Sequence, residues 1–424
     1  MKLQMTSVLK HARCRCRLLP AIGLLLGSVL ALGGCGDGSS ANESAKFSMF
    51  YSFPNGVDGV QEVLIQGSDG NTYALAEGAI TSGTAYVLKI TPAGVGSLLY
   101  SFSAGAYGTN SRSLIQGIDG NLYGTTSNDG AAGNGTVFKI TPAGVESVLY
   151  SFEGGAAGAN PASLIQSADG SLYGATSNGG ATGAGTVFKI TPARIESVLY
   201  SFAGGADGAD PTSLIQASDG NVYGVTQVGG LVNCSGPYVD NIFGFPISPV
   251  GCGAVVKITP SGTVSLLYRF QNDADGYDPT HLIQGSDGNL YGVTLSGGVG
   301  GASCSGKPTY STPCGTVFKL TLSGDHSVLH SFQSGVDGYS PNSLLQGTDG
   351  TLYGTTFDGG SSGFGTIFGV TTAGVESLLY PLDGTHSTPW SLIQGSGGNL
   401  YGLMANPDQP LSLTSSESIF ELSP

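Results

Sequence analysis

Residues 163–202 read SLIQSADGSLYGATSNGGATGAGTVFKITPARIESVLYSF, and this unit recurs along the chain. Its four apolar runs are short and rich in β-branched and aromatic residues, which favour strands. Asp169-Gly170 separates the first two runs, and we interpret this dipeptide as a type I′ hairpin turn. No window of helical length keeps the i, i+3, i+4 apolar spacing of an amphipathic helix. The unit is therefore predicted to be one four-stranded antiparallel sheet, which must stack on neighbouring sheets to bury both of its faces.

The number and offset of the repeats indicate a closed ring. The seventh copy lacks a fourth strand because the chain ends at Pro424, whereas a strand of the fourth type, residues 47–53, stands alone before the first copy. An open β-solenoid gains nothing from this offset, but a ring needs it, since the N-terminal strand then completes the last sheet. We therefore predict a seven-bladed β-propeller of four-stranded antiparallel blades, closed by the N-terminal strand. The Leu-Ile/Leu-Gln triplets that mark the copies begin at Leu64, Leu114, Leu164, Leu214, Leu282, Leu344 and Leu392.

The block LIQGxDGNLYGTT…GTVFKITPAG…LYSF resembles the tandem repeat of the GloVer (Gloeo-Verruco) family of bacterial extracellular proteins with a variable choice of surface anchor. The resemblance covers almost all of residues 47–422. It implies export, anchoring and a repeat fold, and it brings no catalytic residues with it. The fourth and fifth units depart from the pattern by insertions, and Gly397 replaces the turn aspartate in the seventh.

The first 35 residues have the pattern of a lipoprotein-type signal peptide. Basic residues precede an apolar run from Leu18 to Leu32, and small residues precede Cys35. We expect lipidation at Cys35; the alternative is an ordinary signal peptide with an incidental cysteine. Residues 36–46 are small and polar, which is typical of a flexible tether, and residues 47–424 form the propeller. The expected location is that of an exported, membrane-anchored lipoprotein at the bacterial cell envelope or surface.

The charge balance limits the partners that we expect. The chain has 15 basic and 29 acidic residues, a formal net charge of −14, so binding to a phosphate backbone is disfavoured. Because 40% of the residues are hydrophobic, the glycine-rich chain is expected to fold rather than to stay disordered. We expect no nucleic-acid partner, contact with a membrane through the lipid anchor only, and a monomer.

The insertions in the fourth and fifth units each carry two cysteines. Cys234 and Cys252 lie in the loop of residues 229–253, and Cys304 and Cys314 in the loop of residues 297–315. In an exported protein such pairs indicate disulfides. Pairing within each loop is the simpler hypothesis, and pairing between the two loops stays open. Both loops should project from the same face of the ring, because they connect second and third strands.

The connections between units are rich in aspartate on that same face. Clustered carboxylates can bind Ca²⁺, so we consider Asp273, Asp275 and Asp278 as candidate ligands. The alternative is that they only form solvated turns. No other cofactor is expected.

One position of the first strand varies while its neighbours repeat. In a propeller this strand lines the central channel, so a varied position there predicts a ring of ligand-binding residues; the alternative is a tolerant exposed position. His281, which replaces the serine before its triplet, could face the channel beside Asp278 as the best available catalytic pair. The varied positions are Glu62, Arg112, Ala162, Thr212, Thr280, Asn342 and Trp390, of which the single tryptophan is best suited to stack on a sugar.

The sequence contains no catalytic motif. We therefore expect a surface-anchored, non-enzymatic binding or scaffold protein with a glycan or protein ligand. The alternative is a secreted carbohydrate-active or lactone-hydrolysing propeller enzyme that uses the same face, because the fold by itself does not assign an activity.

Overall fold

The computed structural model describes residues 45–53, 63–77, 85–102, 111–128, 130–230, 251–271, 274–299, 314–333, 335–383, 387–405 and 418–424. The chain divides into two compact units, Met1–Glu43 and Ser44–Pro424, and the described residues all belong to the second unit. Within them, no helix is long and apolar enough to cross a membrane.

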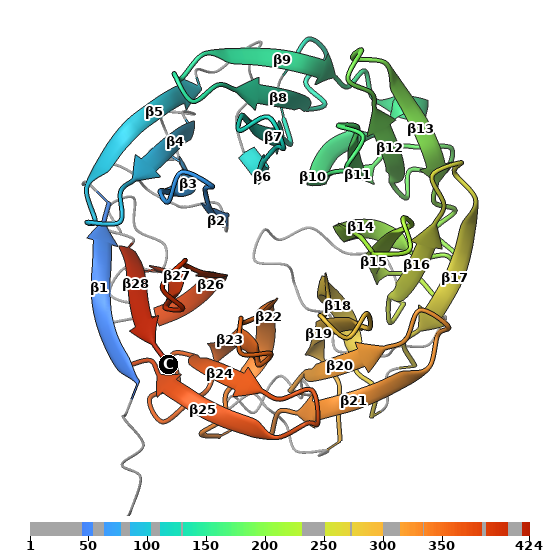
Figure 1. Ribbon diagram of the computed structural model, residues 1–424. Coiled ribbons are helices and arrows are strands. Elements are labelled where there is room, and N and C mark those ends of the chain that lie inside the picture. The colour runs from blue at the N-terminus through green and yellow to red at the C-terminus, as the bar shows by residue number, and fades with distance from the viewer. Residues whose placement is uncertain are drawn as a thin grey trace, which may run out of the picture. The chain divides into compact units, whose positions relative to one another are not determined.

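The described strands form seven four-stranded antiparallel sheets arranged around one axis, which confirms the predicted seven-bladed β-propeller (Figure 1). We number the blades 1–7 by their innermost strands, in chain order. The innermost strands are β2 (Leu64–Gln66), β6 (Ser111–Gln116), β10 (Ala159–Gln166), β14 (Ala209–Gln216), β18 (Tyr277–Gln284), β22 (Tyr339–Gln346) and β26 (Ser387–Gln394). The second strands are β3 (Thr72–Glu77), β7 (Leu122–Thr126), β11 (Leu172–Asn178), β15 (Val222–Val228), β19 (Leu290–Ser296), β23 (Leu352–Asp358) and β27 (Leu400–Ala405).

The outer half of each blade consists of its third and fourth strands. The third strands are β4 (Ala85–Ile90), β8 (Thr136–Ile140), β12 (Thr186–Ile190), β16 (Ala254–Ile258), β20 (Thr316–Leu320), β24 (Thr366–Val370) and β28 (Ser418–Ser423). The outermost strands are β5 (Gly96–Phe102), β9 (Glu146–Ser151), β13 (Glu196–Ser201), β17 (Val264–Arg269), β21 (His326–Ser331), β25 (Glu376–Pro381) and β1 (Lys46–Ser52). One short 3-10 helix, η1 (Gly155–Ala157), precedes β10.

Strand β1 closes the ring, as the offset of the repeats predicted. It pairs antiparallel with β28, with Lys46 opposite Ser423, and so becomes the fourth strand of blade 7. The Phe47 ring stacks on Tyr380 of blade 6 at 4.3 Å between centroids, and Tyr51 lies against Gly96 of blade 1. The N-terminal strand therefore joins blade 7 to both of its neighbours.

The hydrophobic core lies between the blades. Each buried cluster takes residues from two adjacent sheets; one combines Phe202 of blade 3 with Leu214 and Val256 of blade 4. Phenylalanines also meet edge-to-face across the joints, as Phe152 and Phe188 do at 5.0 Å. A single blade could not bury these side chains, which is why the ring needs all its repeats.

The two ends of the blades form different faces. Hairpin turns between first and second strands and between third and fourth strands make the turn face; the second-to-third connections and the connections between blades make the loop face. The turn at Asp169 differs from the type I′ turn that we predicted, because only Gly170 has a positive φ (82°). The reason is that the Asp169 carboxylate accepts the Ser171 N–H at 2.9 Å, which holds the aspartate in an ordinary Asx-type turn.

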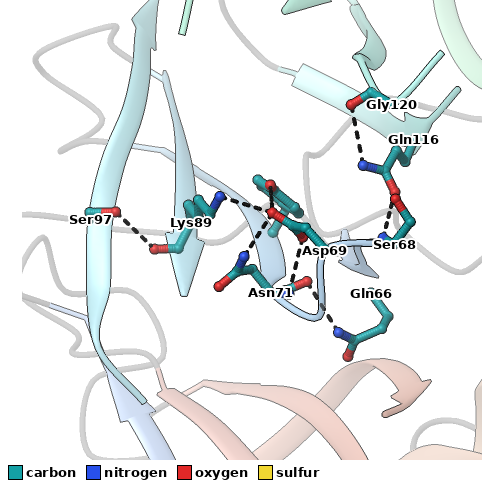
Figure 2. Close-up of polar contacts among 9 residues, drawn as sticks. Gln66, Ser68, Asp69, Asn71, Lys89, Ser97, Gln116 and Gly120 are labelled. Carbon is teal, nitrogen blue, oxygen red and sulfur yellow. Dashed lines mark hydrogen bonds and ion pairs between the residues drawn. The ribbon is translucent and has the colours of Figure 1, made fainter. Parts of the chain in front are cut away.

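On the turn face, the turn aspartates of blades 1, 2, 4 and 5 tie three strands of their own blade together, as Figure 2 shows for Asp69. The Asp69 carboxylate accepts hydrogen bonds from the Asn71 N–H (3.1 Å) and the Tyr73 hydroxyl (2.9 Å), and it pairs with the Lys89 ammonium (2.9 Å). The first, second and third strands thus share one anchor. The same contacts recur around Asp119, Asp219 and Asp287.

Blade 7 keeps this anchor with a different residue. Gly397 takes the turn position, and Glu421 of β28 takes the position of the lysine. The Glu421 carboxylate accepts the Asn399 amide at 2.6 Å and the Tyr401 hydroxyl at 2.8 Å. The acceptor has therefore moved from the turn to the third strand.

The triplet glutamine of five blades joins neighbouring blades on the turn face. The Gln116 carbonyl oxygen accepts the Ser68 N–H of blade 1 at 2.7 Å, while its amide donates to the Gly120 carbonyl of its own turn at 3.2 Å (Figure 2). Gln166, Gln284, Gln346 and Gln394 make the equivalent inter-blade bond. The repeat therefore conserves its glutamine for assembly of the ring.

Candidate functional site

On the loop face, the start of the innermost strand in blades 3, 4, 5 and 6 is fastened to the preceding blade. The Asp210 N–H donates to the Ala184 carbonyl at 3.1 Å, and the Asp278 N–H donates to the Cys252 carbonyl at 3.1 Å. The next residue is a proline that packs against a glycine of the preceding blade; Pro279, for example, lies beside Gly253. The second-to-third loops and the starts of the innermost strands therefore lie on the same face, as we predicted.

This fastening imposes an unusual backbone conformation. Asp210 and Asp278 have φ of 54° and 64°, in the left-handed region that L-residues other than Asn and Asp seldom adopt. Both precede a proline, which further restricts the backbone. Strain of this kind costs about 1–3 kcal/mol per residue and is concentrated at functional sites. The equivalent residues of blades 3 and 6, which have the same conformation, are Asn160 and Ser340.

Asp210 interacts electrostatically with two other charged side chains of the innermost strands, Arg112 and Asp278. Burial raises the pKa of the Asp278 carboxyl to about 6, the Gln227 amide opposes this rise, and the nearby Asp210 adds to it. Burial likewise raises the pKa of Asp210, which a hydrogen bond from Ser177 and the positive charge of Arg112 lower in part. Blades 2, 4 and 5 thus contribute a guanidinium and two carboxyls to one site, and we call Arg112, Asp210 and Asp278 the charged triad.

The sequence had pointed to Arg112 and Asp278, but it had not singled out Asp210. A signal for it was present: a polar residue directly before a proline lies at the second position of the innermost strand in five successive blades. Those dipeptides are Asn160-Pro161, Asp210-Pro211, Asp278-Pro279, Ser340-Pro341 and Thr388-Pro389.

Some of the predicted ring residues have other partners. The Asn342 amide donates to the Pro389 carbonyl of blade 7 at 2.8 Å, and its oxygen accepts the Thr355 hydroxyl at 2.6 Å. Asn342 therefore acts as a strut between blades 6 and 7. The hydroxyl oxygens of Thr212 and Thr280 are buried. Ligand binding by these three residues remains a prediction.

Trp390 and His281 are half-buried. The Trp390 ring meets Phe357 of blade 6 edge-to-face at 4.7 Å, so an aromatic pair spans the joint between blades 6 and 7. Burial lowers the pKa of the His281 imidazole, which keeps it neutral at neutral pH. No contact joins His281 to Asp278 among the described side chains, so the predicted catalytic pair stays a prediction.

The candidate Ca²⁺ ligands have the following environments. The Asp275 carboxylate accepts the Tyr268 hydroxyl at 2.8 Å and the Gln271 N–H at 3.0 Å, which makes it part of the connection between blades 4 and 5. Asp278 belongs to the charged triad, and Asp273 lies outside the described residues. Within the described part of the chain, no group of three or more His, Cys, Asp or Glu side chains is arranged to bind a metal ion.

Cys252 and Cys314 are buried at the loop face. Their carbonyls accept the N–H groups of Asp278 and Ser340, respectively, so both cysteines lie directly at a joint between blades. The predicted partners Cys234 and Cys304 lie outside the described residues, as do Cys35 and Glu62. The disulfide pairing therefore remains a prediction.

A family model described as the Gloeobacter/Verrucomicrobia repeat matches residues 26–238 and 301–423. The chain belongs to this repeat family. The resemblance seen in the LIQGxDGNLYGTT block is thereby confirmed, and the match includes blades 1–3, 6 and 7 completely. A search of curated proteins finds no match to the Gloeobacter/Verrucomicrobia repeat chain.

Among solved structures, this repeat protein is similar to the extracellular domain of a proposed one-component system from B. thetaiotaomicron, with a TM-score of 0.54 and 11% identity. That likeness covers 88% of this chain but 39% of the other, so the chain spans about two fifths of that protein's length. The periplasmic gluconolactonase of Pseudomonas aeruginosa is similar over 80% of this chain and 95% of its own, at 15% identity and a TM-score of 0.49. At such identities the similarity concerns the fold alone.

Proposed function

We propose that this protein is a surface-anchored, non-enzymatic binding protein that holds a glycan at the loop face of its propeller. The observation that carries the proposal is that Asp210 and Asp278 lie at the starts of the innermost strands of adjacent blades on the loop face, with the Arg112 guanidinium acting on Asp210. Blades 3 and 6 have Asn160 and Ser340 in the place of the two aspartates, whereas four blades of the turn face repeat the same contacts. A varied, charged site on a repeated frame is what recognition of one particular ligand requires.

The chemistry of the site suits a sugar. Carboxylates accept hydrogen bonds from neighbouring hydroxyls, and a guanidinium donates to hydroxyl, ring or carboxylate oxygens. Trp390 and Phe357 supply an aromatic pair on other blades of the ring, and aromatic faces bury the apolar side of a ligand. Arg112 is exposed and Asp278 is half-buried, so both keep surface that a ligand can reach.

A second candidate function rests on the acidity of the two carboxyls. Asp278, with a pKa of about 6 beside Asp210, could supply a proton at neutral pH, as a carbohydrate-active enzyme requires of its general acid. This enzyme would release new reducing ends from a polysaccharide. A binding protein would retain the polysaccharide unchanged, so one reducing-end assay on the bound ligand separates the two candidates.

The test is a glycan array with the full chain, followed by calorimetry on the best ligand. Asp278→Asn should weaken binding by about 1.5–3 kcal/mol, which is roughly tenfold or more, because it removes a charged hydrogen-bond acceptor. Asp325→Asn, an exposed aspartate of the turn face, is the matched control and should bind normally. Equal affinity in both variants would show that the ligand binds elsewhere. If the propeller binds a protein that carries no sugar, a protein ligand replaces the glycan proposal.

The anchor is part of the same proposal. Export through residues 1–35 and lipidation at Cys35 would leave residues 36–46 as the connection to β1. Cys35→Ala should release the protein from the membrane fraction or leave the signal peptide uncleaved. Mass spectrometry of the mature N-terminus tests this directly, and a lipid-modified Cys35→Ala protein would rule the site out. Peptide mapping without reduction would test Cys234–Cys252 and Cys304–Cys314 in the same preparation.

A further inference from the structure

The corner between third and fourth strands on the turn face exposes a large apolar residue in most blades. In blades 1, 2, 3 and 6 this residue accepts the same backbone hydrogen bond from a threonine four positions earlier, so the four side chains occupy equivalent places. Their exposed fractions are 63% for Val95, 63% for Val145, 64% for Ile195 and 65% for Val375. Single exposed apolar residues are common in proteins, but a series of them at one repeated corner calls for a reason.

The distribution of these corners around the ring is uneven. Blades 4 and 5 have Thr263 and Asp325 at the same place. In blade 7 the equivalent residue is Lys46, the first residue of β1. Lys46 pairs with Ser423 and so occupies the position that Ile195 has in blade 3. In ring order the apolar corners therefore occupy blades 6, 1, 2 and 3, on both sides of the corner at which the chain enters the propeller. We call Val95, Val145, Ile195 and Val375 the apolar arc.

Neighbouring side chains extend this surface. Ile118, in the turn between the first two strands of blade 2, is 73% exposed on the same face, and Met49 of β1 and Leu98 of β5 are 42% and 58% exposed on the outermost strands. In blades 1 and 2, Lys89 and Lys139 each neutralise the turn aspartate of their blade, whereas Asp349 of blade 6 has Gly369 in the place of that lysine. By contrast, Asp210 and Asp278, together with Asp275 of the connection, lie on the loop face.

We propose that the apolar arc is the surface with which the propeller lies on a phospholipid bilayer, so that the loop face points away from the membrane. This inference rests on the proposed anchor at Cys35. The chain between Cys35 and Lys46 has the composition of a flexible linker, whose root-mean-square length for eleven residues is roughly 18 Å. A lipid on Cys35 would therefore hold the entry corner, and the arc on either side of it, near the bilayer surface.

A lipid anchor at Cys35 and the apolar arc would each strengthen the binding of the other to the bilayer. Once the chain is tethered, contact of the arc with lipid becomes intramolecular, so even a small gain per side chain orients the domain. The same orientation presents the charged triad to the exterior, where a soluble or cell-surface glycan can reach it.

The chain's single tryptophan allows a direct test. The lipidated full chain is reconstituted into phosphatidylcholine vesicles with ordinary or dibrominated acyl chains, which quench tryptophan fluorescence on contact. In the double variant Trp390→Phe/Val145→Trp, the reporter lies on the apolar arc. In the matched control Trp390→Phe/Val336→Trp, it replaces a 68% exposed valine of the loop face. Both replaced valines are exposed, so both variants should fold.

We expect brominated vesicles to quench the reporter at position 145 and to leave both Trp390 of the wild type and the reporter at position 336 unquenched. Equal quenching at positions 145 and 336, or quenching at 336 alone, would overturn the proposal. If the chain floats with the vesicles but the reporter at position 145 is unquenched, the apolar arc does not contact lipid, and only the anchor at Cys35 is supported. Analytical ultracentrifugation would then show whether a second copy of the chain covers the apolar arc. A chain that is neither lipidated nor carried by vesicles overturns the anchor and this inference together.

Discussion

The turn face and the loop face are opposite ends of the same strands, yet Asp219 at one end and Asp278 at the other have opposite environments. On the turn face, burial would raise the pKa of Asp219, but hydrogen bonds from Asn221 and Tyr223 and the Lys257 ammonium outweigh it and lower that pKa to about 2. On the loop face, burial raises the pKa of Asp278 to about 6. The comparison teaches that the turn aspartate is surrounded by donors for its charge, whereas the Asp278 carboxyl is desolvated.

The backbone shows the same contrast. The turns of the turn face give positive φ to glycine, as at Gly170, where it costs little; the exception is Arg194 in the third-to-fourth-strand turn of blade 3. The loop face gives positive φ to Asp210 and Asp278, where it costs more. The strained residues other than glycine are therefore concentrated on the loop face, where Asp278 also has a desolvated carboxyl.

The largest effect is expected from the strand on which both faces depend. Deletion of β1 (Lys46–Ser52) removes the fourth strand of blade 7 and leaves β28 as an open edge. It also removes the Phe47–Tyr380 stack at the joint to blade 6. We expect the loss to consume most of the roughly 5–15 kcal/mol that keeps a domain folded. Thermal melting of the truncated chain measures this, and an unchanged melting temperature would contradict closure of the ring by β1.

A smaller loss is expected from one anchor of the turn face. Asp219→Ala removes the acceptor for Tyr223, Asn221 and Lys257, and we expect a loss of about 1–3 kcal/mol at neutral pH. Because the folded pKa lies below the ordinary 3.8, this stabilisation is present above pH 4 and disappears as the pH falls toward 2. Urea unfolding of wild type and variant should therefore differ at pH 7 and converge at pH 2. A constant difference would show that the carboxylate charge is not involved.

The loop face should respond with the opposite sign. Asp278→Asn removes a desolvated charge from a left-handed backbone position that asparagine tolerates, so we expect a gain of about 1–2 kcal/mol at pH 7. Since the folded pKa is raised, wild-type stability is greatest below pH 4 and falls as the pH rises through about 6, and the variant should lack this fall. Unfolding between pH 4 and 7 measures both effects. A destabilised variant would remove the contrast between the two faces.

The smallest effect is expected in blade 7, where the carboxylate acceptor is Glu421 of the third strand instead of an aspartate in the turn. Glu421→Lys leaves Asn399 and Tyr401 without their acceptor and should cost about 1 kcal/mol. Adding Gly397→Asp should restore the arrangement of blades 1, 2, 4 and 5, because a side chain at Gly397 meets open space. A double-mutant cycle by urea unfolding measures the coupling, and purely additive effects would refute the compensation between these positions.

Much of the fold could be predicted from local signals. The alternation of the apolar runs, the turn at Asp169-Gly170 and the seven triplets determine the strands and their number. The type of that turn could not be predicted, because the Asp169 side chain competes for the Ser171 N–H, and a dipeptide pattern does not show this. The bridging role of Gln116 was also missed, since its partner Ser68 belongs to another blade.

The candidate site depended far more on tertiary structure. The sequence identified a varied position and named Arg112 and Trp390, but it gave no sign that Asn342 is engaged between Pro389 and Thr355. It also left Asp210 unnoticed among turn aspartates. The sequence by itself determined the blade, its sevenfold repetition and the closing strand, because these follow from short-range patterns and from the offset between the chain ends. Only the ring decided that Arg112 and Asp278 each act on Asp210, because closure brings together strands that are distant in the chain and fastens the starts of β14 and β18 to the preceding blade.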